Sequence, residues 1–166
     1  MDLPAILLLT ATILSGLVAG LLYAYSCSVN PGLGALPDRE YLAAMQSINK
    51  AIQNPLFFLS FMGTLLLLPA SSFASWRQSG MSGQLILLLS ATLIYIVAVF
   101  GTTMFGNVPL NEQLAKLILG NLSAEELKAG RLHFETPWNG LHQVRTLASV
   151  LTFVLMVFIC WGRNRV

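Results

Sequence analysis

A cluster of side chains in the last third of the chain has the composition of an acid–base site. Trp138, His142 and Arg145 are spaced i, i+4, i+7, and Asn139, His142 and Thr146 are spaced i, i+3, i+7. At helical spacing all five side chains share one flank of a helix. An imidazole can act as a general base near neutral pH, and a guanidinium can stabilise a developing oxyanion. The spacing therefore predicts a polar site on one helix face.

This site falls inside an apolar stretch, where charge is costly. Arg145 is eight residues past Pro137, which is about 12 Å along a helix axis. An ionisable residue at that depth needs an anion, carbonyl groups or a water-filled cavity. Glu112 and Glu135 are the nearest candidate carboxylates by topology. The alternative is structural, with Arg145 in an ion pair and Trp138 in the interfacial aromatic belt.

Polar residues from two other segments are expected at the same end of the molecule. Asn107 and Asn111 follow the third apolar stretch, and Asn111 has the alternative role of a helix N-cap. In the first stretch Gly16 and Gly20 form a GxxxG motif, which lets another helix approach closely. Tyr23 lies one turn further and is predicted to present its hydroxyl to the same site. Together these residues predict an apolar pocket with a few placed polar groups.

The composition excludes several classes of protein. Of the 166 residues, 55% are hydrophobic and only 10% are charged, whereas a soluble domain carries about a quarter charged residues. The net charge is +2 and no basic run is present, so a nucleic-acid partner is not expected. Cys27 and Cys160 have no metal-ligand spacing. Disorder and an ordinary soluble enzyme are excluded as well.

Four apolar stretches define the predicted fold. Each is about 20 residues long, enough to cross a hydrocarbon core of about 30 Å as a helix. Because they are apolar almost all round, a soluble bundle is disfavoured. We therefore predict an all-α integral membrane four-helix bundle, a single membrane domain over residues 1–166, with an uncleaved first helix. The spans are expected at about residues 3–26, 55–75, 84–105 and 137–161.

The two long loops lie on one face and are predicted to contain amphipathic helices. In the first loop a helix starts at Pro37-Asp38, and its apolar stripe includes Met45. In the second loop a helix is expected over about residues 110–119. Ser123 and Glu126 then form a capping box for a short helix that ends near Gly130.

Two further signals concern the fourth span and the orientation. Thr136-Pro137 is expected to supply the N-cap and first residue of that span. Lys and Arg favour the cytoplasmic side. Arg77 lies in the short loop between spans two and three, and Arg163 and Arg165 lie in the C-terminal tail. Both termini are therefore expected in the cytoplasm.

Motifs spread over nearly the whole chain resemble a known family. The stretches are Gly16–Asn30, Met45-Gln46-Ser47-Ile48-Asn49 with Asn54-Pro55, Asn107-Val108-Pro109-Leu110-Asn111, and Trp138 through His142 to Arg145-Thr146. In these stretches the chain resembles a family of small four-helix membrane proteins that includes the fungal anthrone oxygenases. The Asn-Val-Pro-Leu-Asn motif is the most specific of them. The resemblance adds Asn49 and Met45 to the expected substrate contacts, beside Trp138 and Asn139.

The resemblance implies an anthrone oxygenase-like monooxygenase acting on a lipophilic, enolisable substrate with O₂. A base removes the acidic C–H next to a carbonyl, and the resulting carbanion reacts with O₂ directly, so no cofactor is expected. His142 is the expected base, and Trp138 would stack on a flat ring. Four polar residues would stabilise the enolate and the peroxide: Arg145, Asn107, Asn111 and Tyr23.

Several alternatives stay open on the sequence alone. A single transition-metal ion held by His142, with His133 as a second ligand, would give a metal-dependent oxygenase. A quinone- or lipid-binding accessory membrane protein would need the same apolar cavity but would consume no O₂. A transporter is the least favoured, because no span has a central charge pair. Membrane lipid and the small substrate are the expected partners, and homo-oligomerisation through the GxxxG face stays open.

Overall fold

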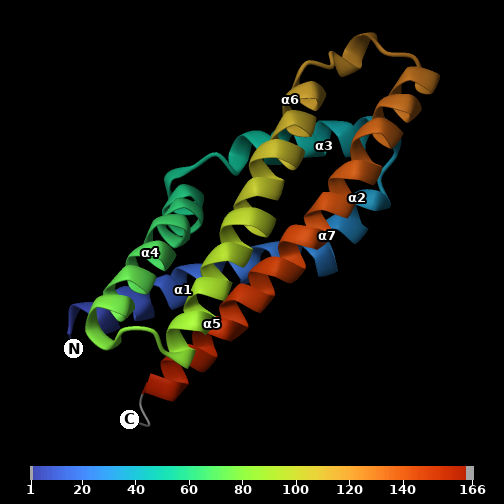
Figure 1. The fold of residues 1–166 in the computed structure, drawn as a ribbon. Helices are drawn as coiled ribbons and strands as arrows, with labels where there is room; N and C mark the ends of the chain where they lie inside the picture. Colours follow the sequence, from blue (N-terminus) through green and yellow to red (C-terminus); the bar gives the residue numbers. More distant parts are fainter. Residues whose placement is uncertain (1, 164–166) are drawn as a thin grey trace.

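The computed structural model, described for residues 2–163, is a bundle of four long helices (Figure 1). Within the described residues no strand occurs. Helix α1 (Leu3–Ala24) packs on α4 (Pro55–Ser79) and α7 (Ala124–Arg163), and α5 (Gly83–Ile94) packs on the same two helices. The start of α1 and the end of α7 lie at the same end of the bundle (Figure 1). The predicted all-α four-helix bundle is confirmed.

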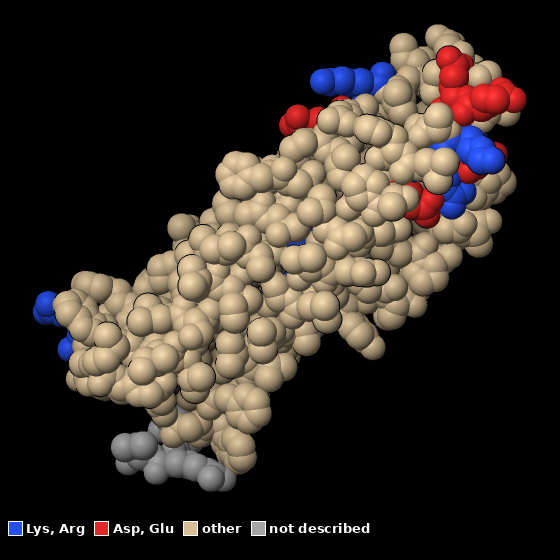
Figure 2. All heavy atoms as spheres, turned by 45° about the vertical axis from the view of Figure 1, so that its right-hand side comes forward, with Lys and Arg blue, Asp and Glu red and all other residues tan. Residues whose placement is uncertain are grey.

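Four continuous helical stretches are long and apolar enough to cross a membrane. They cover Leu3–Gly34, Pro55–Ser79, Gly83–Ala115 and Ala124–Gly162. On the face shown in Figure 2, charged side chains gather at the two ends of the molecule, and the surface between them is almost entirely uncharged. These features indicate an integral membrane protein. The orientation expected from Arg77, Arg163 and Arg165 stays a prediction, and Arg165 lies outside the described residues.

The first and third spans are longer than predicted, because they continue past a π-helical segment. The first continues through Tyr25–Val29 into α2 (Asn30–Gly34), and the third through Tyr95–Gly101 and Thr103–Asn107 into α6 (Val108–Ala115). A Pro follows closely in both α2 and α6. The wider turn before each proline leaves room for its ring, which would otherwise clash with the carbonyl four residues back. The helix expected over residues 110–119 is thus found as α6, but it continues the third span and ends at Ala115, earlier than predicted.

The fourth span also begins earlier than predicted. Helix α7 is continuous from Ala124, with Pro137 inside it, so the break expected near Gly130 and the N-cap at Thr136 are wrong. A proline removes one helical hydrogen bond, whereas a break leaves four N–H and four C=O groups without partners. Continuity is therefore the less costly choice at the membrane. The Ser123–Glu126 capping box is confirmed at the start of α7, with Nα of Ser123 2.8 Å from Oε2 of Glu126.

Helix α3 (Asp38–Ala51) crosses the end of the bundle where α6 and the start of α7 lie (Figure 1). It buries Tyr41, Leu42 and Met45 and confirms the amphipathic helix predicted in the first loop. Gln46 secures α3 by donating to the carbonyl groups of Leu114 and Leu117, at 2.8 and 3.0 Å. The apolar side of α3 thus forms a cover over this end of the bundle.

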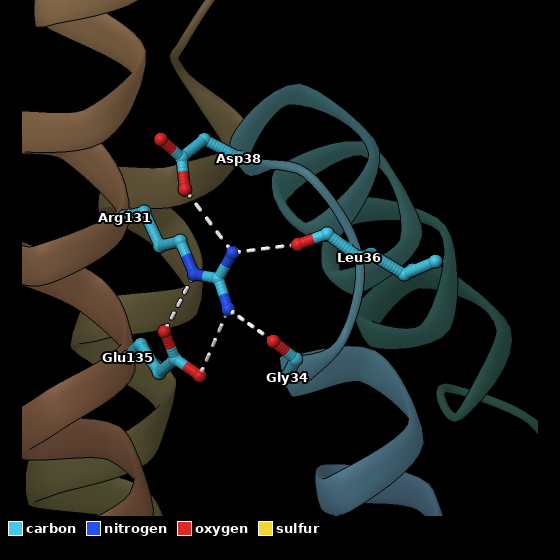
Figure 3. Close-up of polar contacts among 5 residues, drawn as sticks. All are labelled: Gly34, Leu36, Asp38, Arg131 and Glu135. Atoms are coloured by element: carbon cyan, nitrogen blue, oxygen red, sulfur yellow. Dashed lines mark hydrogen bonds and ion pairs between the residues drawn. The ribbon is translucent and has the colours of Figure 1, made fainter.

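Arg131 joins the connection between α2 and α3 to helix α7 (Figure 3). Its guanidinium donates to the carbonyl groups of Gly34 and Leu36 and pairs with Asp38 at 3.1 Å and Glu135 at 2.6 Å. It also lies 4.4 Å from the centroid of the Tyr41 ring. Burial and the Glu135 carboxylate raise the pKa of Tyr41 above its ordinary value, so this phenol is neutral.

Of the two glycines in the GxxxG motif of α1, only the first lies at a contact between helices of this chain. A Cβ atom added to Gly16 would lie 2.8 Å from the Phe153 ring of α7, so a larger residue does not fit without movement. Gly20 is exposed, and a Cβ atom there would meet nothing within 4 Å. Gly16 thus serves the close approach of α1 and α7. Association of two copies stays a prediction.

Candidate active site

His142 is the centre of the polar cluster and is buried in the bundle, with 1% of its surface exposed. It belongs to α7, and the π-helical segment Tyr25–Val29 approaches it from the first span. Oγ of Ser26 lies 2.9 Å from Nε2 of His142. The first and fourth spans therefore meet at this imidazole, well inside the charged ends of the molecule.

Aromatic rings enclose the imidazole. The Trp138 indole stacks on His142, with ring centroids 5.1 Å apart and an interplanar angle of 12°. Tyr25 meets both rings at a steep angle, 5.4 Å from His142 and 5.6 Å from Trp138. The Tyr25 hydroxyl donates to Sδ of Met45 in α3 at 3.4 Å. Met45 thus contacts Tyr25, and its role as a substrate contact stays a prediction.

Arg145 contacts the opposite nitrogen of the same imidazole. Its Nε and one terminal nitrogen lie 3.2 and 3.1 Å from Nδ1 of His142. The guanidinium carbon is 5.0 Å from the centroid of the Trp138 ring. The flank predicted from the spacing of Trp138, His142 and Arg145 is therefore observed. The expected partners Glu112 and Glu135 are wrong, because Glu112 is exposed and Glu135 pairs with Arg131.

These contacts fix the tautomer of His142. A guanidinium can only donate, so Nδ1 must be the accepting nitrogen. On the other side, Oγ1 of Thr146 donates to the carbonyl of His142 at 2.7 Å, and Oγ of Ser26 is 3.3 Å from Oγ1 of Thr146. The Ser26 hydroxyl can thus donate to Thr146 and accept from His142. The neutral imidazole therefore bears its proton on Nε2, and the lone pair on Nδ1 is covered by Arg145.

Two asparagines of the third span hold the indole in place. Nε1 of Trp138 donates to Oδ1 of Asn111 at 2.8 Å, and Nδ2 of Asn107 donates to the Trp138 carbonyl at 3.2 Å. Asn111 lies inside α6, so its alternative role as an N-cap is wrong. Oδ1 of Asn107 is buried without a hydrogen-bond partner. An unpaired buried acceptor is costly, and it leaves one site for a donor from a ligand.

Close packing of α7 on the third span begins beside Asn107. A Cβ atom added to Gly106 would lie 2.8 Å from Cδ1 of Leu141. A larger residue at 106 would require the Leu141 side chain to move. The absence of a side chain thus helps Asn107 to reach the Trp138 carbonyl.

The other two predicted contact residues, Asn139 and Asn49, differ in their hydrogen bonding. Asn139 accepts a hydrogen bond from Asn30 of α2 at 3.0 Å. Nδ2 of Asn49 in α3 is buried without a partner. Both residues are half-buried. Asn139 is therefore already engaged, whereas Asn49 has a free donor inside the fold.

Tyr23 does not lie where the sequence predicts. It is 60% exposed, and Tyr25 takes the place expected for it. The reason is that Tyr23 shares the exposed face of α1 with Gly20, whereas Tyr25 and Ser26 follow the buried Leu22 by three and four residues. Tyr25 and Ser26 thus continue the buried stripe of the first span at ordinary helical spacing. That spacing, together with their polar types, is the signal in the sequence that could have found them.

The two-histidine variant of the metal hypothesis is wrong on geometry. His133 and His142 are nine residues apart on one continuous helix, which separates them by about 13.5 Å along the axis. One ion cannot bind both. Among the described residues no group of three or more His, Cys, Asp or Glu side chains could hold a metal ion.

Two surface pockets lie away from His142. One, of about 430 Å³, is formed between α6 and α7 and includes His133 and Phe134; the other, of about 330 Å³, is formed between α4 and α5 and includes Trp76. Neither is lined by His142 or Arg145. The rings that contact His142 are those of Trp138 in α7 and Tyr25 in the first span.

Comparison with known proteins identifies the family. A family model described as anthrone oxygenase matches residues 57–155, more than half of the chain. The match includes Asn107, Trp138, His142 and Arg145, whereas Tyr25 and Ser26 precede it. The searches of curated proteins and of solved structures gave no match. The chain therefore belongs to the anthrone oxygenase family and at that level has an oxygenase-like role.

Proposed function

We propose that this protein is a membrane-embedded oxygenase for a lipophilic, enolisable, anthrone-like polycyclic ketone, with His142 as the base. Family membership supports the reaction type. The observation that supports the residue is the buried imidazole, stacked on an indole and bonded by a guanidinium at the nitrogen with the lone pair. A base, an oxyanion partner and a ring surface are thus assembled on one helix.

The proposed reaction balances without an external reductant. The base takes a proton from the CH₂ group of the substrate, and the carbanion gives up an electron to O₂. The two radicals combine to a peroxide anion, which takes the proton back from His142. The hydroperoxide then loses water, as its C–H and O–O bonds break and a new carbonyl forms. One oxygen atom enters the product and the other leaves in water.

Each residue of the cluster has a defined part in this scheme. Nδ1 of His142 receives the substrate proton, because Nε2 already bears one. Ser26 accepts the Nε2–H bond and so steadies the imidazolium that forms. Arg145 stabilises the enolate oxygen, and Trp138 supplies the ring surface.

The membrane location suits this chemistry. A flat apolar substrate partitions into the bilayer and reaches the bundle sideways. The apolar surroundings keep water away from the carbanion, which would otherwise be reprotonated. The scheme requires no cofactor, since the substrate supplies the electrons. A single transition-metal ion on His142 is the alternative, and it predicts metal in stoichiometric amount in active protein.

An oxygen-uptake assay tests the proposal. The purified protein in lipid vesicles is given an anthrone that bears a ring hydroxyl, and O₂ consumption is compared with protein-free vesicles. This compound is the anthrone of every test below. We expect uptake well above the spontaneous rate, and loss of that excess in His142→Gln. His133→Gln, the matched histidine control, should keep it. Binding of the ring compound without O₂ uptake would instead support the accessory-protein alternative.

A further inference from the structure

Arg145 is a cation in the apolar part of the molecule without a carboxylate partner. Both ion pairs found among residues 2–163 belong to Arg131. The partners of Arg145 are a neutral imidazole and an indole face. A charge in a membrane span is costly unless an anion or water compensates it. The largest unmet electrostatic demand of this bundle is therefore an anion at Arg145.

Arg145 also blocks the proposed base. Two of its nitrogens lie within 3.2 Å of Nδ1 of His142. While they donate there, the only lone pair of the imidazole cannot accept a substrate proton. The opposite nitrogen offers no substitute, because it is protonated and directed at Ser26. The site as folded is thus closed to base catalysis until Arg145 moves.

We propose that Arg145 is a gate that an oxyanion on a planar aromatic ligand opens, so that ligand binding itself exposes the base. This inference rests on the proposed function and names its substrate class: ring ketones that bear an ionised hydroxyl in addition to the CH₂ group that is oxidised. A charged oxygen is a stronger acceptor for a guanidinium than a neutral imidazole. Transfer of Arg145 to that oxygen frees Nδ1 and neutralises the buried cation in one movement.

The surroundings of Arg145 favour a planar ligand over an aliphatic anion. The guanidinium lies over the Trp138 ring, so an oxygen that meets it is held beside an aromatic face. Asn107, which donates to the Trp138 carbonyl, has an unpaired buried acceptor. This acceptor can take a hydrogen bond from a hydroxyl at the ring edge. A fatty-acid carboxylate supplies the charge but nothing for the ring surface or the amide.

Nitrogen NMR tests the gate directly, because the chain contains only two histidines, His133 and His142. The full chain is labelled with ¹⁵N-histidine in lipid nanodiscs, and His142→Gln assigns the signals. The probe is a hydroxyanthraquinone, which has no oxidisable CH₂ and changes colour when it ionises. We expect the Nε2–H tautomer with a hydrogen-bonded Nδ1 before addition. Addition of the probe should then move the ¹⁵N chemical shift of Nδ1 of His142 toward the value of a nitrogen with a free lone pair, and the His133 signals should stay unchanged.

A matched pair of variants separates the gate from general effects. In Arg145→Met the Nδ1 signal should lie at the free position before any ligand is added, and the probe should bind at least about tenfold more weakly. Gln143→Met places the same side chain at an exposed position two residues earlier and should behave as the wild type. Arg145→Lys keeps the charge but loses the planar fork and should fall between them.

Three results would overturn the inference. These are a protonated Nδ1 in the free protein, an Nδ1 signal unaffected by bound probe, or an equal response to a saturated fatty acid, which would identify a lipid anion as the ligand. The test does not depend on turnover. If the probe moves Nδ1 but anthrone causes no O₂ uptake, the gate stands and the oxygenase proposal fails. If O₂ uptake is seen but the Nδ1 chemical shift does not change, the oxygenase proposal stands and the gate fails.

Discussion

Arg131 and Arg145 lie fourteen residues apart on α7, about 21 Å along the axis, and their guanidinium groups meet different partners. Arg131 is neutralised by Asp38 and Glu135 and donates to two carbonyl groups (Figure 3). Arg145 has no carboxylate within ion-pairing distance among the described residues and donates to His142. One group is satisfied by the fold, and the other is left with an unmet charge.

The difference separates a structural arginine from a functional one. The contacts of Arg131 with Gly34, Leu36 and Asp38 tie the connection between α2 and α3 to α7, so its removal should cost stability. Arg145 ties together residues three and seven positions away on its own helix and closes no loop. The free-energy cost of removing its guanidinium from water is not offset by an ion pair among the described residues. A protein retains such a cost where function requires it.

The largest effect is expected at the imidazole beside Arg145. His142→Gln keeps a polar side chain of similar reach but removes the base. General-base catalysis contributes about 10²- to 10⁴-fold, so the rate of O₂ uptake with anthrone should fall by that factor. The free energy of unfolding of the purified protein in detergent should change little. Retention of the wild-type rate would exclude His142 as the base.

Arg131→Met should show the opposite pattern. It leaves two carboxylates and two carbonyl groups without their common donor, and we expect a loss of about 2 kcal/mol in the free energy of unfolding. The rate per folded molecule should stay unchanged. Lys128→Met, an exposed change one turn earlier on α7, is the control and should be neutral. Loss of activity at full stability would show that the two arginines do not differ as described.

Ser26→Ala probes the nitrogen of His142 that Arg145 does not contact. The change removes the acceptor of the Nε2–H bond, and we expect about tenfold slower turnover, equivalent to about 1.4 kcal/mol. The ¹⁵N spectrum should show a second tautomer of His142. Ser28→Ala, in the same π-helical turn but exposed, should have no effect on either. An unchanged tautomer in Ser26→Ala would contradict the role assigned to this hydroxyl.

The smallest effect is expected at Trp138. Trp138→Phe keeps a ring beside His142 but removes the bond to Asn111, so the KM for anthrone should rise about fivefold with kcat nearly unchanged. Trp76→Phe, an exposed aromatic at the far end of the bundle, is the control. A fall in kcat alone would place Trp138 in the chemical step rather than in ring binding.

The sequence was sufficient for those features that depend on local pattern. Four apolar stretches predict four spans, the stripe that includes Met45 predicts α3, and Ser123 with Glu126 predicts the start of α7. The i, i+4, i+7 spacing places Trp138, His142 and Arg145 on one flank, because α7 is regular there. The family resemblance is confirmed by the family match.

The errors occur where a local pattern does not decide which helix face is buried, where a helix breaks or which partner a charge meets. The GxxxG motif favours the face of Gly20 and Tyr23, which is exposed, over the face that Tyr25 continues from the buried Leu22. Pro137 signals a break that the membrane makes too costly. Glu135 is nearer to Arg131 on its own helix, at i, i+4, than to Arg145. Only the structure could therefore show that Arg145 has no carboxylate partner among the described residues.

Isotope incorporation tests the central claim most directly. The wild-type protein in lipid vesicles converts anthrone under ¹⁸O₂, and mass spectrometry measures the label in the newly formed carbonyl. The account predicts one ¹⁸O atom in each product molecule and one ¹⁸O atom in water. This product should form far faster than in vesicles with His142→Gln. Product without ¹⁸O, or equal rates with both proteins, would contradict oxygenation at the His142–Arg145 site.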